Sequence, residues 1–169
     1  MDGFEVESPE VGRDPADVSR RFLPRVYNFC RAVLGSGVDA EDACQETFLA
    51  IARHRDELER VARLTPWVLT IARNACRYQR RRRNRASYTE LPDDVPTSEG
   101  APFGAADEVA KVRAAIERLP ERYRAVLNLH YQQGLAPQEA AEVLEVSEGA
   151  LRVLLHRAIV KLREEVRRP

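Results

Sequence analysis

Cationic and hydrogen-bonding side chains gather on one arc of the helix that is predicted to follow Ser147. Turning about 100° per residue from the apolar Leu151 places the following side chains on the opposite arc: Arg152, Val153, His156, Arg157, Val160 and Arg163. In a major groove, arginine reads guanine edges, and both arginine and histidine reach phosphates. This arc therefore predicts a recognition helix for duplex DNA. The alternative is an ordinary two-helix hairpin with a solvated basic face.

A second basic surface is expected on the helix that runs over 67–85. Arg73, Arg77 and Arg81 share one face, with a guanidinium group about every 6 Å, close to the spacing of phosphates along a strand. The same polar arc carries Thr70, Asn74 and Arg80, and the apolar arc carries Trp67, Val68, Leu69, Ile71, Ala75 and Tyr78. We expect this face to contact DNA phosphates. The alternatives are a helix that lies on an anionic membrane surface and a solvated arginine run.

Two helices joined by a tight turn should position the first of these surfaces. Pro137 suits the first position of the earlier helix, because the amide at that position has no partner. Ser147 is the expected N-cap of the later one. The predicted core stripe of the later helix consists of Leu151, Leu155, Ala158, Leu162 and Val166. This pattern, over about 136–163, is typical of a helix-turn-helix.

Apolar spacing predicts helices along the rest of the chain as well. The first runs from about Ala16 to Leu34, and the second, over 39–53, has Asp39 as its expected N-cap and Asp42 in a capping box. After a loop or short helix, Thr65 is the expected cap of the third. Two more helices precede the helix-turn-helix, with these expected core residues: Val109, Val112, Ile116, Leu119, Tyr123, Val126, Leu127, Leu129 and His130.

Composition excludes several classes of protein. The 169 residues are 44% hydrophobic and 32% charged, which is typical of a soluble globular protein. No run approaches the roughly 18 apolar residues of a membrane span, and the first residues are acidic and lack a hydrophobic signal core. We therefore expect a cytoplasmic protein without membrane contact of its own.

Cysteine and histidine give no sign of metal or covalent chemistry. Cys30, Cys44 and Cys76 are widely spaced and form no CxxC pair, so we expect them to pack in the core rather than to bind metal or sense redox state. The three histidines, His54, His130 and His156, form no nucleophile or metal constellation with the cysteines or carboxylates. An enzyme is disfavoured, and no cofactor is expected.

Charge is strongly segregated although the formal net charge is zero. The stretch over 1–15 is acidic and lacks periodicity, which predicts a mobile tail. The stretch over 86–106 combines Pro, Gly, Ser and acids without Lys or Arg, which predicts a flexible acidic linker. The sequence thus predicts an all-α protein with two small helical domains, over 16–85 and 107–169, the second containing the helix-turn-helix.

Three ordered motifs resemble one family. They are DAEDACQETFLAIARH over 39–54, TPWVLTIARNACRYQRRR over 65–82, and IERLPERYRAVLNLHYQQGLAPQEAAEVLEVSEGALRVLLHRAIVKL over 116–162. Together they look like the extracytoplasmic function group (group 4) of the bacterial sigma-70 family. The resemblance implies a sigma factor that binds core RNA polymerase, recognises −10 and −35 promoter elements and helps to open DNA, and that is held by an anti-sigma factor.

The resemblance also implies roles for individual residues. Those expected to bind polymerase are Asp42, Gln45, Glu46, Phe48 and Leu49. Those expected at the −10 element, where the loop before Trp67 would receive a flipped base, are Trp67, Arg73, Asn74, Arg77, Arg80 and Arg81. Those expected at the −35 element are Ser147, Glu148, Arg152, Val153, His156 and Arg157. The acidic linker corresponds to a segment that threads through a positively charged polymerase channel.

The sequence departs from the family pattern at the presumed DNA-reading domain. Glu145 stands where the turn usually has Gly, and a left-handed residue there would be strained. Leu154 replaces a usual Arg, and Ile159 with Val160 replaces a basic pair, so a less cationic −35 face is expected. The competing function is an autonomous helix-turn-helix regulator that binds duplex DNA without polymerase.

Overall fold

The computed structural model describes residues 12–35, 37–87 and 105–168, and every regular element within them is helical. The elements are α1 (Pro15–Leu34), α2 (Gly37–Arg53), α3 (Arg55–Leu58), α4 (Leu64–Ser87), α5 (Ala105–Glu117), α6 (Glu121–Leu127), the π-helical turn η1 (Asn128–Gln132), α7 (Pro137–Leu144) and α8 (Glu148–Val166). The all-α prediction is confirmed. The predicted tail lies mostly, and the predicted linker almost entirely, outside the described residues. None of the described helices is long and apolar enough to cross a membrane.

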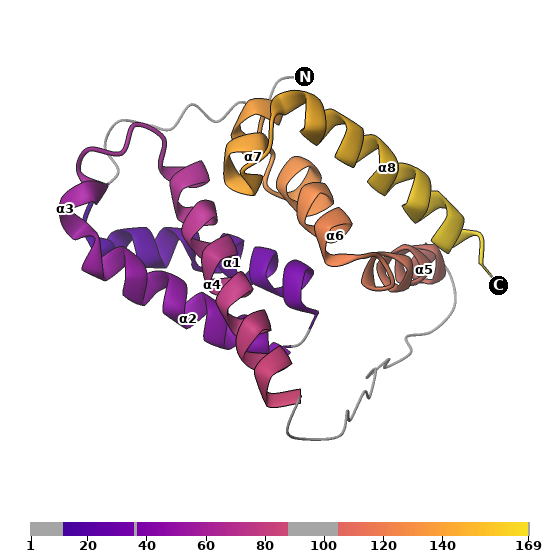
Figure 1. Ribbon diagram of the computed structural model, residues 1–169, viewed down its shortest axis with the longest axis horizontal. Coiled ribbons are helices and arrows are strands. Elements are labelled where there is room, and N and C mark those ends of the chain that lie inside the picture. Colours follow the sequence, from indigo (N-terminus) through magenta and orange to yellow (C-terminus); the bar gives the residue numbers. More distant parts are fainter. Residues whose placement is uncertain (1–11, 36, 88–104, 169) are drawn as a thin grey trace.

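The N-terminal half is built from α1, α2 and α4, which pack against one another (Figure 1). α1 begins as predicted, because the Asp14 carboxylate accepts a hydrogen bond from the Ala16 amide at 3.2 Å. It ends at Gly35, whose φ of 75° is readily adopted only by glycine. Apolar side chains of all three helices form the core of this half, in which Phe22 and Phe29 of α1 are fully buried.

Two predicted helix caps of this half are wrong. α2 begins at Gly37, so Asp39 lies within its first turn and pairs instead with Arg83 of α4 at 3.2 Å. α4 begins at Leu64, and Thr65 is therefore inside the helix, where its hydroxyl accepts a hydrogen bond from Arg25 at 3.3 Å. In both cases the side chain finds a partner on another helix, which the local sequence does not reveal.

The C-terminal half is built around α8, which packs against α5, α6 and α7. The prediction that Val109 and Val112 lie in its core is wrong, because they are 59% and 39% exposed. Leu119 is buried, as predicted, and Ala115, which was not predicted, is buried as well. The reason is that α5 packs chiefly against one neighbour, α8, so most of its surface stays open.

The two halves lie side by side and share one continuous hydrophobic cluster. α6 packs against α1, and α7 packs against α4, so that α6 lies between α8 and the N-terminal half (Figure 1). Polar contacts reinforce this packing. Arg124 of α6 donates to the carbonyls of Ala32 and Val33 at the end of α1, both at 2.7 Å. The backbone carbonyls of Arg25 and Gln133 each accept a hydrogen bond from the other residue's side chain.

Candidate nucleic-acid interface

The predicted recognition helix is present, with its polar arc open to solvent. The Ser147 hydroxyl accepts a hydrogen bond from the Ala150 amide at 3.1 Å, so the predicted N-cap of α8 is confirmed. The predicted arc is exposed throughout: Arg152, Val153, His156, Arg157, Val160 and Arg163. Glu148, in the first turn, is also exposed and pairs with Arg152. The arc therefore offers cationic, hydrogen-bonding and apolar groups on one surface.

The predicted core stripe of α8 is confirmed at Leu151, Leu155, Ala158 and Leu162, which are buried or pack against the core, but it differs at two positions. Leu154 is only 6% exposed and belongs to the core, together with Leu151, Ala158 and Glu165. Val166, which was expected in the core, is 36% exposed. The covered arc is set by where α5, α6 and α7 lie, and it extends to Leu154 but leaves Val166 open. Because Leu154 lies in the core, the lack of an arginine at this position does not make the exposed face less cationic, contrary to the expectation from the sequence.

Arg73, Arg77 and Arg80 of α4 turn toward the C-terminal half and are paired there. Arg73, whose side chain is 13% exposed, donates to the Val143 carbonyl at 2.7 Å and to the Glu145 carboxylate at 2.8 Å. Arg77 approaches the same carboxylate at 3.5 Å, and Arg80 pairs with Glu121 of α6. The hydrogen bond from Arg73, with the charges of Arg73 and Arg77, lowers the pKa of the Glu145 carboxyl. Sequence reasoning did not find these pairs.

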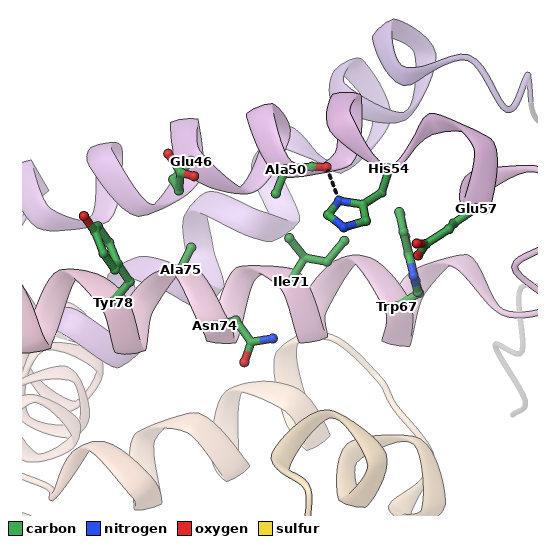
Figure 2. A pocket seen from close by; sticks show the side chains of 9 residues that line it. All are labelled: Glu46, Ala50, His54, Glu57, Trp67, Ile71, Asn74, Ala75 and Tyr78. Carbon is green, nitrogen blue, oxygen red and sulfur yellow. Dashed lines mark hydrogen bonds between the residues drawn. The ribbon is translucent and has the colours of Figure 1, made fainter.

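A cleft of about 420 Å³ runs between α2 and α4 (Figure 2). Trp67 and Asn74, both predicted at the −10 element, line it, so the structure places these two on one wall. Glu46 and His54 line it as well, and the His54 imidazole Nδ1 lies 2.8 Å from the Ala50 carbonyl. Tyr78 was assigned to the apolar arc, but it is 59% exposed at this cleft. The lining suits a planar ring with hydrogen-bonding edges.

A stripe on the outer side of α2 is exposed and takes no part in the core. It comprises the predicted residues Asp42, Gln45 and Leu49, of which Leu49 is 48% exposed. Val38, which sequence reasoning missed, continues the stripe and is 71% exposed. Its position four residues before Asp42 is the signal that could have identified it. Two further predicted residues, Glu46 and Phe48, are half-buried, and Phe48 packs against the core.

All three cysteines are buried in the N-terminal half, as the core-packing prediction stated. A hydrogen bond with Cys76, together with burial, raises the pKa of the Cys30 thiol, and burial raises that of Cys44 to about 11. Both thiols are therefore protonated at neutral pH, which makes them poor nucleophiles and poor metal ligands. Within residues 12–35, 37–87 and 105–168, no group of three His, Cys, Asp or Glu side chains could hold a metal ion.

Comparison with known proteins identifies both halves. Residues 18–86 match the model of Sigma-70 region 2, and residues 110–162 match that of Sigma-70 region 4. The RNA polymerase sigma factor CarQ of Myxococcus xanthus is 32% identical over 88% of this chain and 86% of its own length. The ECF RNA polymerase sigma factor SigF of Caulobacter vibrioides is 35% identical over 85% of this chain and 79% of its own length.

The fold has a solved counterpart. The sigma factor RpoE of Bartonella quintana, solved in complex with the anti-sigma factor NepR, superposes with a TM-score of 0.75 over 89% of this chain and 96% of that one, at 23% identity. This likeness concerns the fold. With both region models and two relatives above 30% identity that match over most of their length, the chain belongs to the extracytoplasmic function group of sigma-70 family RNA polymerase sigma factors.

Proposed function

We propose that three surfaces of this chain divide the work of a sigma factor, which binds core RNA polymerase and directs it to promoters. The exposed stripe of α2 docks on polymerase, α4 and its cleft engage the −10 element, and α8 reads the −35 element. The domain boundaries that fit this division are 16–85 and 107–169, joined by the acidic linker over 86–106. The chain itself acts through binding and catalyses no reaction.

The polymerase assignment rests on the stripe of α2 that is exposed and takes no part in the core. Asp42, Gln45 and Leu49 are exposed to solvent. The fold of the described residues therefore gives no reason for an apolar side chain to lie beside an acid and an amide on this surface. A mixed stripe of this kind suits a partner surface that supplies both apolar contacts and basic groups. Glu46 and Phe48 lie at its edge, where Phe48 anchors the helix to the core.

The cleft between α2 and α4 supports the −10 assignment. Trp67 and Asn74 offer an aromatic surface and an amide, which together stack on and hydrogen-bond to an unstacked base. The exposed guanidinium of Arg81 lies farther along the same helix and can neutralise a phosphate. Arg73, Arg77 and Arg80 complete the proposed strand-binding face once they are released from the C-terminal half.

The exposed arc of α8 supports the −35 assignment. Arg152, His156 and Arg157 supply phosphate and base contacts, and Ser147 with Glu148 lies at the helix N-terminus, where recognition helices touch bases. Val153 lies within the first two turns, so we assign it to a thymine methyl group. Val160 lies too far along the helix for a base contact.

We also propose an anti-sigma factor as a protein partner. The RpoE chain of the same fold was solved with such a protein, NepR. In this chain Val160 is 40% exposed in the middle of a polar arc, and we assign it to that partner.

The test of the proposed function is polymerase dependence. Asp42→Arg with Gln45→Ala should abolish binding to core polymerase in a pull-down, while circular dichroism shows unchanged helicity. Asp56→Arg, which reverses an exposed acid of α3, is the matched control and should bind normally. If the unmodified chain footprints a promoter tightly at physiological salt without polymerase, the autonomous regulator is the correct function instead.

A further inference from the structure

We propose that Arg13, which lies just ahead of α1, is a positioning residue for the −10 site. Its guanidinium holds the backbone of the loop over 59–63, which joins α3 to α4 at one end of the cleft between α2 and α4. Arg13 acts through this loop and makes no contact with DNA itself. The inference rests on the proposed function in one respect, namely that the cleft engages an unstacked base of the −10 element.

The guanidinium of Arg13 binds three backbone carbonyls that lie 45 to 48 residues later in the chain. Its Nη1 donates to the carbonyls of Glu59 and Val61 at 2.8 and 2.9 Å, and to that of Leu58 at 3.3 Å. Leu58 ends the four-residue helix α3, and the carbonyls at the end of a helix have no partner within it. Arg13 supplies that partner with a charged donor, which makes stronger hydrogen bonds than a neutral one.

The residues that follow Arg13 fix its own position. The Asp14 carboxylate accepts a hydrogen bond from the Ala16 amide at 3.2 Å, and the Asp14 carbonyl accepts one from the Val18 amide at 3.0 Å. Pro15 is the first residue of α1, where its fixed φ suits the helix, and Val18 is fully buried in the core. The backbone of Arg13 therefore leads directly into a capped and packed helix, which limits where its side chain can reach.

The loop that Arg13 holds connects two residues that line the cleft. Glu57 of α3 and Trp67 in the first turn of α4 lie at the same end of it (Figure 2). The side chain of Leu58 is fully buried and fixes α3 to the core, whereas the loop that follows is largely exposed. An exposed loop samples many conformations, and hydrogen bonds from one guanidinium to its carbonyls remove part of this freedom. Arg13 therefore helps to set the spacing between Glu57 and Trp67.

These hydrogen bonds should matter little for global stability and more for the cleft. The bonds to Glu59 and Val61 are exposed, so water replaces them at small cost when the guanidinium is removed. A site whose loop is free presents the binding arrangement in only a fraction of the molecules, and its apparent affinity falls by that fraction. Arg13 thus supports recognition of a base without being needed for folding, and the two effects can be measured separately.

The experiment uses full-length chains bound to core polymerase, with a barcoded promoter library that is randomised over the −10 and −35 elements and transcripts that are sequenced. Arg13→Ala removes the guanidinium, and Arg13→Lys restores a cation with three N–H donors on one nitrogen. Arg20→Ala is the matched control, because Arg20 is exposed on α1 and pairs with Asp17 of the same helix. Asn74→Ala removes an amide from the cleft wall and tests the proposed function itself.

A second measurement follows the cleft in each free chain. Trp67 is the single tryptophan of the sequence, so quenching of its fluorescence by acrylamide reports how open this end of the cleft is. Circular dichroism shows whether each variant is folded.

We expect Arg13→Ala to weaken the base preference at the −10 element by about threefold or more, to leave the −35 preference unchanged, and to make Trp67 more accessible to acrylamide without loss of helicity. Arg13→Lys should recover part of both losses, and Arg20→Ala should match the unmodified chain. The salt dependence of open-complex formation on the strongest promoter of the library should not change. A lost phosphate contact would instead flatten it by about one unit of slope, and that result would overturn a positioning role.

Two further results would contradict the proposal. A uniform fall in transcription by Arg13→Ala with both base preferences intact would show a merely destabilised protein. An unchanged −10 preference for Arg13→Ala beside an altered one for Asn74→Ala would show that the loop needs no support from Arg13. If Asn74→Ala also leaves the −10 preference unchanged, the fault lies in the proposed −10 role of the cleft, and the inference about Arg13 fails with it.

Discussion

The hydrogen bonds of Arg124 should be a principal stabilising contact between the two halves, and replacing this residue by methionine tests that directly. Its guanidinium donates to the carbonyls of Ala32 and Val33 at the C-terminal end of α1, both at 2.7 Å. It also donates to the carbonyls of Glu117 and Leu119 within its own half, at 3.1 and 2.9 Å. Burial lowers the pKa of this guanidinium, while the charges of Glu121 and Glu117 raise it. The group stays charged at any physiological pH.

The magnitude follows from the two bonds that cross between the halves. A hydrogen bond with a charged donor contributes about 1.5–3 kcal/mol, and a cation at a helix C-terminus adds a favourable interaction with the helix dipole. Since the side chain is only partly buried, water replaces some of the lost interactions. We therefore expect Arg124→Met to lower the free energy of unfolding by about 3 kcal/mol.

Urea denaturation followed by circular dichroism is the assay, with Arg122→Met as the control. Arg122 lies on the same helix and is exposed, so its replacement should change the free energy of unfolding by less than about 0.5 kcal/mol. A loss for Arg124→Met no larger than that of the control would refute the reasoning. It would mean that the carbonyls at the end of α1 are satisfied equally well by water.

Three other predictions follow from named contacts. Leu154→Ala should cost about 2–5 kcal/mol of unfolding free energy because Leu154 is buried, whereas Val153→Ala should be nearly neutral in the same denaturation assay. In a promoter assay, Arg77→Glu should impair open-complex formation and flatten its salt dependence by about one unit of slope, and an unchanged slope would contradict the assignment of Arg77 to DNA. Burial acts to raise the pKa of the Glu165 carboxyl, but hydrogen bonds from Arg118 and Arg168, with the charges of Arg168 and Lys161, outweigh this and lower it. Because the folded-state pKa is the lower one, the stabilisation is complete above the ordinary value of 4.5 and is lost as pH falls through the lowered pKa. Glu165→Gln should therefore be less stable than the parent at neutral pH, and this difference should shrink in acid.

The helices and the helix-turn-helix were predictable because their signals are local. Apolar residues that recur every three or four positions located every long helix. Pro137 marked the beginning of α7, and Ser147 marked the beginning of α8. The exposed arc of α8 and the exposed Asp42 and Gln45 of α2 also followed from angular spacing alone. These features depend on the periodicity of the helix and not on its neighbours.

The errors lie where a neighbouring element decides the outcome. Leu154 is covered although the family resemblance implied a DNA-facing position there, and Val109 and Tyr78 are exposed although spacing placed them inside. The predicted caps at Asp39 and Thr65 failed for the same reason, since each side chain pairs with a residue on another helix. A sequence states which residues can be buried together, but the partner helix determines which arc is covered.

By itself, the sequence determined the helical class, the position of the recognition helix and the family, because helix periodicity and ordered motifs are properties of the chain read along its length. Only the tertiary structure showed that Arg73, Arg77 and Arg80 of α4 pair with acids of the C-terminal half. Arg73 and Glu145 are 72 residues apart, and no local pattern pairs them. Such a contact exists only because packing of α1 on α6 and of α4 on α7 brings two distant charges to hydrogen-bonding distance.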